Sequence, residues 1–182
     1  MKVVFLDRDG VLNEYPGDKK YVNNWEEFKF IPGSIEGIKK LNLSKFRVFI
    51  ISNQAGIAKG LYTKEDLARI DNHMIKALKE KGAFISGIYY CTHHPSDNCA
   101  CRKPKTALLK EAVSSLGLKP KISFFIGDSF FDMKAARNFG AKSILVLSGK
   151  EKIENRKNWE FEPDYIFSDL LSAADYLGSH YE

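Results

Sequence analysis

Three acidic residues follow apolar stretches of the chain at places where they could act together. Asp7 and Asp9 come after the apolar run Val3–Leu6, and Asp128 comes after a second run, Ile122–Ile126. Two unit charges about 4 Å apart repel by about 4 kcal/mol at an effective dielectric constant of about 20, so three carboxylates in one crevice need a cation. Oxygen ligands whose shell is completed by water and a phosphate suit Mg²⁺ better than Zn²⁺ or Ca²⁺. We therefore expect Mg²⁺ at these residues and chemistry on a phosphate.

Further polar and cationic residues could handle a phosphoryl group. Ser52, which follows another apolar run, could donate a hydrogen bond to a non-bridging oxygen, and Asn53 and Gln54 offer neutral donors to the rest of a substrate. Arg102 and Lys103 precede a predicted helix, where a fixed cation near backbone donors can hold a phosphate. Lys103 is the better candidate for the reacting centre. Together with the acids, this set is sufficient for phosphoryl transfer.

Each of these residues also has a purely structural explanation. The acidic pair could cap a turn, Ser52 and Asn53 could form one, and Asp128 could be the N-cap of the next helix. The order of the motifs along the chain favours function over these explanations. Asp132 stays open, because it could orient Asp128 or Lys103 or could merely begin a helix.

All three cysteines lie within eleven residues, at Cys91, Cys99 and Cys101, and they enclose His93 and His94. Two of the cysteines are separated by one residue, which is too close for an easy mutual disulfide. Three thiolates and one imidazole form a common structural zinc set. Four protein ligands leave no open position for water, so we expect Zn²⁺ to order this loop and not to perform hydrolysis. Free thiols beside an incidental histidine are the alternative.

Alternating strands and helices must position these residues. Apolar runs predict strands at Val3–Leu6, Val48–Ile51, Ile88–Tyr90, Ile122–Ile126, Ile144–Leu147 and Tyr165–Phe167. Helical patterns lie at Ser34–Leu43, Thr63–Lys81 with Thr63 as N-cap and Asp66 in a capping box, Thr106–Leu116, Asp132–Phe139 and Leu170–Leu177. This alternation predicts an α/β fold, a doubly wound parallel sheet with helices on both faces. Ligands of such sheets bind at the carboxyl edge beside the topological switch point, where we expect the polar residues to meet.

Length and composition limit the class of protein. With 182 residues, 44% of them hydrophobic, the chain can form one sizeable core, and we expect a single domain over residues 1–182. No apolar run approaches membrane-spanning length, and Asp7 comes too early for a secretory signal, so we expect a cytoplasmic monomer without a membrane partner. Lys and Arg outnumber Asp and Glu by 28 to 23, but they are spread over the chain. Nucleic acid as a partner is therefore permitted and not indicated.

Four motifs carry a resemblance to a known family. The segments Asp7–Gly10, Ser52–Gln54, Arg102–Pro104 and Gly127–Asp128 resemble the motifs of haloacid-dehalogenase-like phosphatases, over nearly the whole chain. The resemblance implies that Asp7 forms an aspartyl-phosphate and that Asp9 protonates the leaving oxygen and then deprotonates the hydrolytic water. This agrees with the chemistry of paired carboxylates. The resemblance also implies that Mg²⁺ is bound by the side chains of Asp7 and Asp128 and the backbone carbonyl of Asp9.

Two longer stretches are more specific. Residues 52–60 and 87–95 resemble the subfamily of heptose bisphosphate phosphatases, which remove the 7-phosphate of D-glycero-D-manno-heptose 1,7-bisphosphate. The resemblance implies a small phosphorylated sugar as substrate, His93 and not His94 as the zinc ligand, and a substrate contact at Tyr21. The zinc loop is shorter than is common there and also resembles histidinol-phosphate phosphatases, which remain the alternative. Extra residues around Gly17–Lys20 could alter the sugar contacts.

The spacing of the motifs leaves no room for a large cap domain. Only 45 residues separate Asp7 from Ser52, and 51 separate Ser52 from Lys103. We therefore expect an open pocket whose selectivity comes from residues 13–32, residues 54–61 and the zinc loop. Two other classes are compatible with parts of the pattern. A non-enzymatic receiver domain would need neither Asp9 nor a zinc loop, and a zinc-stabilised nucleic-acid-binding module is suggested only by the basic charge.

Overall fold

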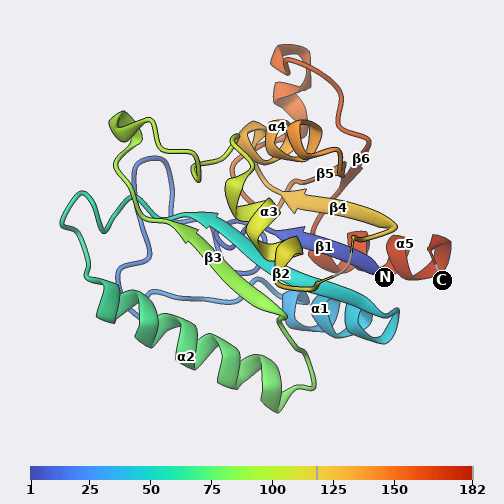
Figure 1. Cartoon of the computed structure of the whole chain (residues 1–182), viewed down its shortest axis with the longest axis horizontal. Helices are drawn as coiled ribbons and strands as arrows, with labels where there is room; N and C mark the ends of the chain where they lie inside the picture. Colours follow the sequence, from blue (N-terminus) through green and yellow to red (C-terminus); the bar gives the residue numbers. More distant parts are fainter. Residues whose placement is uncertain (118, 182) are drawn as a thin grey trace.

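The centre of the molecule is a six-stranded parallel sheet (Figure 1). The computed structural model describes residues 1–117 and 119–181. The strands are β1 (Lys2–Leu6), β2 (Phe46–Asn53), β3 (Gly87–Cys91), β4 (Ile122–Gly127), β5 (Lys142–Val146) and β6 (Tyr165–Phe167). Their spatial order is β3-β2-β1-β4-β5-β6. The chain builds outward from β1 in one direction and then in the other, which confirms the predicted doubly wound sheet.

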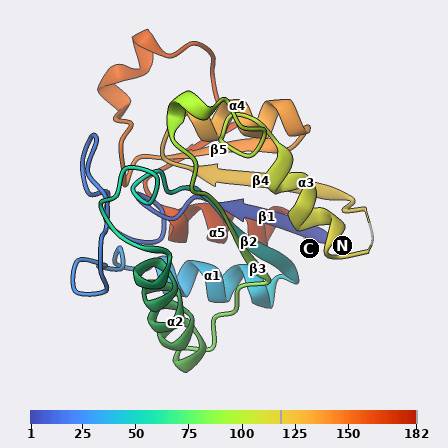
Figure 2. The same ribbon diagram turned by 60° about the vertical axis from the view of Figure 1, so that its left-hand side comes forward.

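Helices cover both faces of the sheet (Figures 1 and 2). They are α1 (Ser34–Leu43), α2 (Lys64–Glu80), α3 (Ala107–Ser114), α4 (Phe130–Phe139) and α5 (Leu170–His180). Successive side chains of a strand point to opposite faces, so Val4 and Leu6 join one core with α1, α2 and α5, while Val3 and Phe5 join another with α3 and α4. All four of these side chains are fully buried. This two-sided burial explains why the central strands read as continuous apolar runs.

The register of the central strands brings the site together. β1 lies between β2 and β4, at the point where the winding of the chain reverses. Leu6 is level with Ile50 of β2 and with Ile126 of β4, so β1 and β4 end within one residue of each other while β2 continues to Asn53. The backbone N–H of Asp7 continues this pairing by donating to Ile126 at 3.0 Å. The residues that follow these strands therefore share one edge of the sheet.

All six predicted strands are present, with ends that differ by up to two residues. One prediction at the end of β5 was wrong, because the strand stops at Val146 and leaves out Leu147. The neighbouring strand β6 has only three residues, and its last residue, Phe167, is paired with Val146.

The helices differ from prediction mainly at their ends. The capping box of Thr63 and Asp66 is confirmed. Helix α4 begins at Phe130 and not at Asp132, because Ser129 is the N-cap and Asp132 completes a capping box with it. Helix α3 is shorter than predicted at both ends, and α5 continues to His180. Two short 3₁₀ helices, η1 (Pro95–Asp97) and η2 (Ile153–Asn158), were not predicted.

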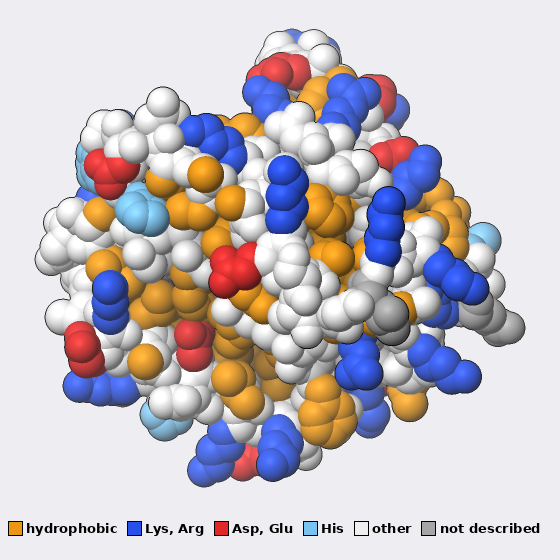
Figure 3. Space-filling view, in the orientation of Figure 1, with side chains coloured by type: hydrophobic (Ala, Val, Ile, Leu, Met, Phe, Trp, Pro, Cys, Tyr) orange, Lys and Arg blue, Asp and Glu red, His pale blue; other side chains and the backbone are white. Residues whose placement is uncertain are grey.

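No further domain is inserted over the sheet within residues 1–117 and 119–181, as expected from the motif spacing. The segment between β1 and α1 is irregular apart from isolated bridges of Asn13 with Asp9 and Phe30. On the face in Figure 3, Lys and Arg side chains are dispersed among acidic and polar ones. Of the helices that the structure describes, none has both the length and the apolar character needed to span a membrane.

Candidate active site

Asp7 is the first residue after β1, and its carboxylate lines a cleft at the carboxyl edge of the sheet. One carboxylate oxygen, Oδ2, lies 2.9 Å from the ammonium of Lys103, and the other accepts a hydrogen bond from the backbone N–H of Arg8 at 2.7 Å. The side chain is 14% exposed. Burial raises the pKa of Asp7 to about 6, although Lys103 acts in the opposite direction. Lys103 alone therefore does not offset the cost of burying this negative charge.

Asp128 and Asp132 complete a cluster of three carboxylates. Oxygen atoms of Asp7, Asp128 and Asp132 lie within 4.8 Å of one another. Burial raises the pKa of Asp128 well above its ordinary value, and the charges of Asp7 and Asp132 raise it further. The cluster contains more negative charge than Lys103 balances, which is the electrostatic demand expected from the sequence.

Asp132 has partners of its own. Its Oδ1 lies 2.6 Å from Lys103, and its Oδ2 accepts hydrogen bonds from the backbone N–H and the hydroxyl of Ser129 at 3.1 and 2.7 Å. It is fully buried. Asp132 therefore does not begin α4 but lies in its capping box, and of the two residues that it was expected to orient it contacts Lys103.

Lys103 is the cation of the cluster. It is only 2% exposed, and its ammonium also donates to the backbone carbonyl of Ile51 at 2.9 Å, at the end of β2. Burial acts to lower the pKa of Lys103, but Asp132 and Asp7 together raise it above its ordinary value. The lysine therefore stays charged, with its ammonium directed at Asp7.

A segment that sequence reasoning missed closes around Asp128. The backbone N–H of Lys150 donates to the Asp128 carboxylate at 2.7 Å, and the Ser148 hydroxyl donates to the carbonyl of Gly10 at 2.7 Å. A Cβ at Gly10 or Gly149 would lie about 2 Å from the Asp128 carboxylate, so only glycine permits this close approach. The signal was present, because polar residues follow β5 at the same edge of the sheet as they follow β1, β2 and β4.

The carboxylate of Asp9 is surrounded by donors from other residues. Its Oδ1 accepts hydrogen bonds from the Arg8 guanidinium at 3.1 Å and from the Asn13 amide at 2.9 Å, and its Oδ2 accepts one from the Gln54 amide at 2.9 Å. Arg8 is fully buried between the rings of Phe28 and Tyr90. Asp9 is 17% exposed and lines the same cleft as Asp7. The two acids thus have distinct surroundings.

Ser52, Asn53 and Gln54, at the carboxyl end of β2 and directly after it, take different positions. Ser52 lines the cleft next to Asp7. Asn53 also lines it, but its side-chain amide is hydrogen-bonded at both ends to the backbone of Lys103, at 3.1 and 3.3 Å. Gln54 is fully buried, with its amide bonded to Asp9, Ser52 and Tyr62. We expected Gln54 to offer donors to a substrate. In the structure, its side-chain amide already has hydrogen-bond partners within the protein.

The cleft has a volume of about 200 Å³. Beyond the residues above, its lining includes Arg102, Tyr21, Lys150 and the inserted segment Gly17–Lys20. Tyr21 accepts a hydrogen bond from Lys59 at 3.0 Å and also lines a neighbouring cavity of about 690 Å³. Asp18 at the rim forms an exposed ion pair with Lys150 at 3.0 Å. The rim thus carries several cations that a second anionic group of a ligand could contact.

Asp7 and Asp128 fit Mg²⁺. Both offer hard oxygen ligands in a crevice, whereas the third carboxylate, Asp132, is already held by Lys103 and Ser129. Mg²⁺ usually binds one or two carboxylates and completes its shell with water and phosphate oxygens. Burial is the main reason that the pKa values of Asp7 and Asp128 are raised, and a divalent cation bound to both carboxylates would offset the cost of burying their negative charges.

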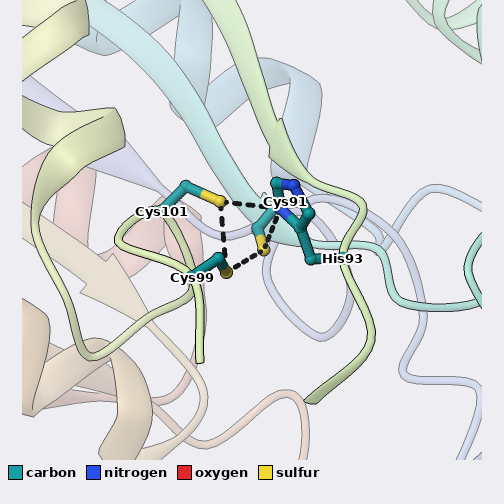
Figure 4. Close-up of side chains that lie close together, drawn as sticks. All are labelled: Cys91, His93, Cys99 and Cys101. Carbon is teal, nitrogen blue, oxygen red and sulfur yellow. Dashed lines mark hydrogen bonds between the residues drawn. The ribbon is translucent and has the colours of Figure 1, made fainter. Parts of the chain in front are cut away.

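The second cluster of metal-binding residues is formed by the last residue of β3, Cys91, and by the loop that follows it (Figure 4). The Cys91 sulfur lies 3.5 Å from that of Cys99, which lies 3.4 Å from that of Cys101, and Nδ1 of His93 lies 3.1 Å from the Cys101 sulfur. Zinc–sulfur bonds of about 2.3 Å in a tetrahedron require sulfur atoms about 3.8 Å apart, so these four ligands fit Zn²⁺. His94 instead bonds Ser96 at 2.7 Å and caps η1, which leaves His93 as the histidine of this cluster.

Comparisons with known proteins agree with this geometry. A family of HAD-hydrolase-like proteins matches residues 100–173. The chain is 37% identical over 181 residues to the D-glycero-beta-D-manno-heptose-1,7-bisphosphate 7-phosphatase of Pasteurella multocida, covering 96% of this chain and 94% of that one. The Helicobacter pylori (strain ATCC 700392 / 26695) enzyme of the same name is 40% identical over 147 residues, with 80% and 83% covered. The crystal structure of D,D-heptose 1,7-bisphosphate phosphatase from B. bronchiseptica complexed with magnesium and phosphate is similar with a TM-score of 0.89 at 31% identity, covering 97% and 98% of the two chains.

Proposed function

This chain belongs to the haloacid-dehalogenase-like hydrolases and is a phosphomonoester hydrolase, and we propose that it removes the 7-phosphate of D-glycero-D-manno-heptose 1,7-bisphosphate. The observation that carries the proposal is the carboxylate of Asp7, which lines the cleft 2.9 Å from the buried Lys103 and beside Asp128. Relatives that match nearly the whole chain carry the name of this activity.

In the first step, a carboxylate oxygen of Asp7 attacks the phosphorus atom. The bond from phosphorus to the sugar oxygen breaks, and Asp9 gives its proton to that oxygen, so the sugar leaves as a neutral alcohol. Lys103 and the Ser52 hydroxyl stabilise the non-bridging oxygens, on which negative charge is concentrated. The result is an aspartyl-phosphate on Asp7.

In the second step, a water molecule attacks the phosphorus atom of this aspartyl-phosphate. Asp9 accepts a proton from the water, the bond between phosphorus and the Asp7 oxygen breaks, and inorganic phosphate leaves. Asp7 is regenerated as a carboxylate and Asp9 as an acid. The donors around Asp9 keep its carboxylate at the cleft through both steps.

Mg²⁺ in this proposal is held by the side chains of Asp7 and Asp128 and by the backbone carbonyl of Asp9. When bound, it neutralises the phosphate dianion and removes the repulsion between the two carboxylates. Asp128 is aligned for this role by the N–H of Lys150 and by the close packing of Gly10 and Gly149. Zn²⁺ in the loop after β3 is structural, since its four ligands close the shell.

Selectivity for a bisphosphate comes from the rim of the cleft. Arg102, Lys19, Lys20 and Lys150 supply cations there, and a sugar that carries two phosphates can contact them with the phosphate that is not removed. Tyr21 is a candidate contact for the sugar itself. The Asp18–Lys150 pair is exposed and therefore weak, so an incoming phosphate can exchange with Asp18.

A phosphate-release screen tests the proposal. The protein would be assayed, with and without Mg²⁺, on both anomers of the heptose 1,7-bisphosphate, on heptose 1-phosphate and 7-phosphate, and on histidinol phosphate. We expect the highest kcat/KM for a heptose bisphosphate, release of one phosphate per molecule, and loss of activity without Mg²⁺. Histidinol phosphate is the second candidate because the zinc loop is short. A preference for it by orders of magnitude would defeat the heptose assignment.

A further inference from the structure

Gln54 links the Asp9 carboxylate to a residue outside the cleft. Its Nε2 donates to Oδ2 of Asp9 at 2.9 Å and to the Ser52 hydroxyl at 3.2 Å, and its Oε1 accepts a hydrogen bond from the Tyr62 hydroxyl at 2.5 Å. A carboxylate can only accept and an amide N–H can only donate, so these partners define which end of the amide faces Asp9. The Asp9 carboxylate therefore sets the orientation of the Gln54 amide, and the Tyr62 hydroxyl holds the amide in that orientation by donating to its other end.

Tyr62 is well placed for this task. It is 6% exposed and lies near the end of the segment that leads from β2 to α2. Burial raises the pKa of the Tyr62 hydroxyl above its ordinary value, so it stays a donor at neutral pH. A Cβ at Gly56 would lie 2.1 Å from Cε1 of the Tyr62 ring, so the ring occupies space that the missing side chain leaves. The described lining of the cleft includes Ser52 and Asn53 but neither Gln54 nor Tyr62.

We infer that Tyr62 is a positioning residue for the reaction, which acts through Gln54 to hold Oδ2 of Asp9 in place for proton transfer to the leaving oxygen. The inference rests on the proposed function in one respect, the acid/base role of Asp9. Arg8 and Asn13 bind mainly the other oxygen of Asp9, so removing the Tyr62 hydroxyl loosens one side of the carboxylate and leaves the other side held. General acid catalysis contributes about 10²- to 10⁴-fold, and a misplacement of about 1 Å can remove much of it.

A series of aryl phosphates separates positioning from folding. Nitrophenyl phosphate releases a stable anion that needs little protonation, whereas phenyl phosphate releases a poorer leaving group that depends on the acid. We expect Tyr62→Phe to lower kcat/KM about tenfold on phenyl phosphate and only about twofold on nitrophenyl phosphate. Gln54→Glu keeps the size and the acceptor for Tyr62 but removes the donor to Asp9, so it should show the same pattern with a larger loss. Tyr165→Phe is the matched control, since its hydroxyl pairs with Tyr181 away from the cleft.

The outcomes distinguish this inference from the proposed function. Equal losses on both aryl phosphates for Tyr62→Phe and Gln54→Glu would mean that the pair only supports the fold, and would overturn the inference. Asp9→Asn serves as the reference. If Asp9→Asn also leaves the ratio between the two substrates unchanged, the acid role of Asp9 itself is wrong. If Asp9→Asn shifts the ratio and the Tyr62 and Gln54 variants do not, only the inference fails.

Discussion

The carboxylate cleft and the zinc loop are both clusters of metal-binding side chains, but the chain builds them in opposite ways. Asp7 and Asp128 come from the ends of two neighbouring strands and meet only because β1 and β4 are in register. Cys91, His93, Cys99 and Cys101 lie in one short segment that begins at the last residue of β3. The cleft therefore depends on the pairing of strands across the sheet, whereas the ligands of the loop are brought together by one local segment of the chain.

The two clusters also differ in whether a bound cation would keep coordination positions for ligands from outside the protein. In the cleft, a buried lysine already balances part of the charge, and a metal held by two carboxylates keeps positions for phosphate and water. In the loop, burial raises the pKa of Cys91, and burial with the neighbouring thiols raises that of Cys101 to about 12. Zn²⁺ would hold all three thiolates and close its shell. The cleft is suited to chemistry and the loop to stability.

The sharpest test of this contrast is Asp7→Asn. In the proposed mechanism Asp7 is the nucleophile, so its replacement by an amide should lower turnover at least about 10⁴-fold. The unfolding free energy should not fall, since one of three mutually repelling carboxylates is lost. Phosphate release and denaturant unfolding measure the two effects. Asp175→Asn, an exposed acid on α5, is the control, and wild-type turnover in Asp7→Asn would refute the scheme.

Lys103→Met should affect both activity and stability. The variant removes the cation that contacts Asp7 and Asp132, so we expect a loss of about 10²- to 10³-fold in kcat and about 3 kcal/mol in unfolding free energy. The exposed pair of Lys142 with Asp164 offers a matched control, for which Lys142→Met should cost less than about 1 kcal/mol.

A second variant identifies the cause of that loss. Adding Asp132→Asn to Lys103→Met removes a buried charge that has lost its partner, so stability should recover while activity stays low. If the double variant is less stable than Lys103→Met, charge balance is not the reason that this lysine is buried.

The sequence allowed much of the cleft to be predicted, because the polar residues at the carboxyl ends of β1, β2 and β4 follow one rule of parallel sheets. It could not show that Gln54 turns inward, since Ser52, Asn53 and Gln54 look alike as donors until Tyr62 supplies a buried partner. The approach of Gly149 to Asp128 was equally hidden, because it depends on how the chain turns after β5. Local contacts such as the Thr63 capping box were predictable, whereas long-range side-chain packing was not.

Cys99→Ser tests the other side of the comparison. Metal analysis should find about one zinc per wild-type molecule and less in the variant, and the unfolding free energy should drop by several kcal/mol because zinc binding contributes to folding. Per folded molecule, kcat should change by less than about threefold, since a closed zinc shell performs no chemistry. His94→Ala, next to a ligand but outside the cluster, should retain zinc. A stable, zinc-free wild-type loop would contradict this interpretation.

The pH dependence of stability without Mg²⁺ separates the two regions without changing turnover or removing a metal ligand of the loop. The pKa of Asp7 is raised to about 6 from an unfolded value of 3.8, so between these values the folded state binds more protons than the unfolded state. Stability from this group is therefore fully present below about pH 4 and is lost as the pH rises through about 6, by up to about 3 kcal/mol. Asp128 acts in the same direction.

The zinc loop has the opposite dependence, because acid protonates its thiolates and releases the metal. Comparing wild type with Asp7→Asn in Mg²⁺-free buffer cancels the contribution of the loop and leaves that of the cleft. From pH 7 to pH 5, the unfolding free energy of wild type should rise relative to that of the variant, and saturating Mg²⁺ at pH 7 should abolish most of the difference. If the unfolding free energies of the two proteins change equally from pH 7 to pH 5, the ionised form of Asp7 is not destabilised in the folded state. A magnesium ion would then have no buried charge there to offset.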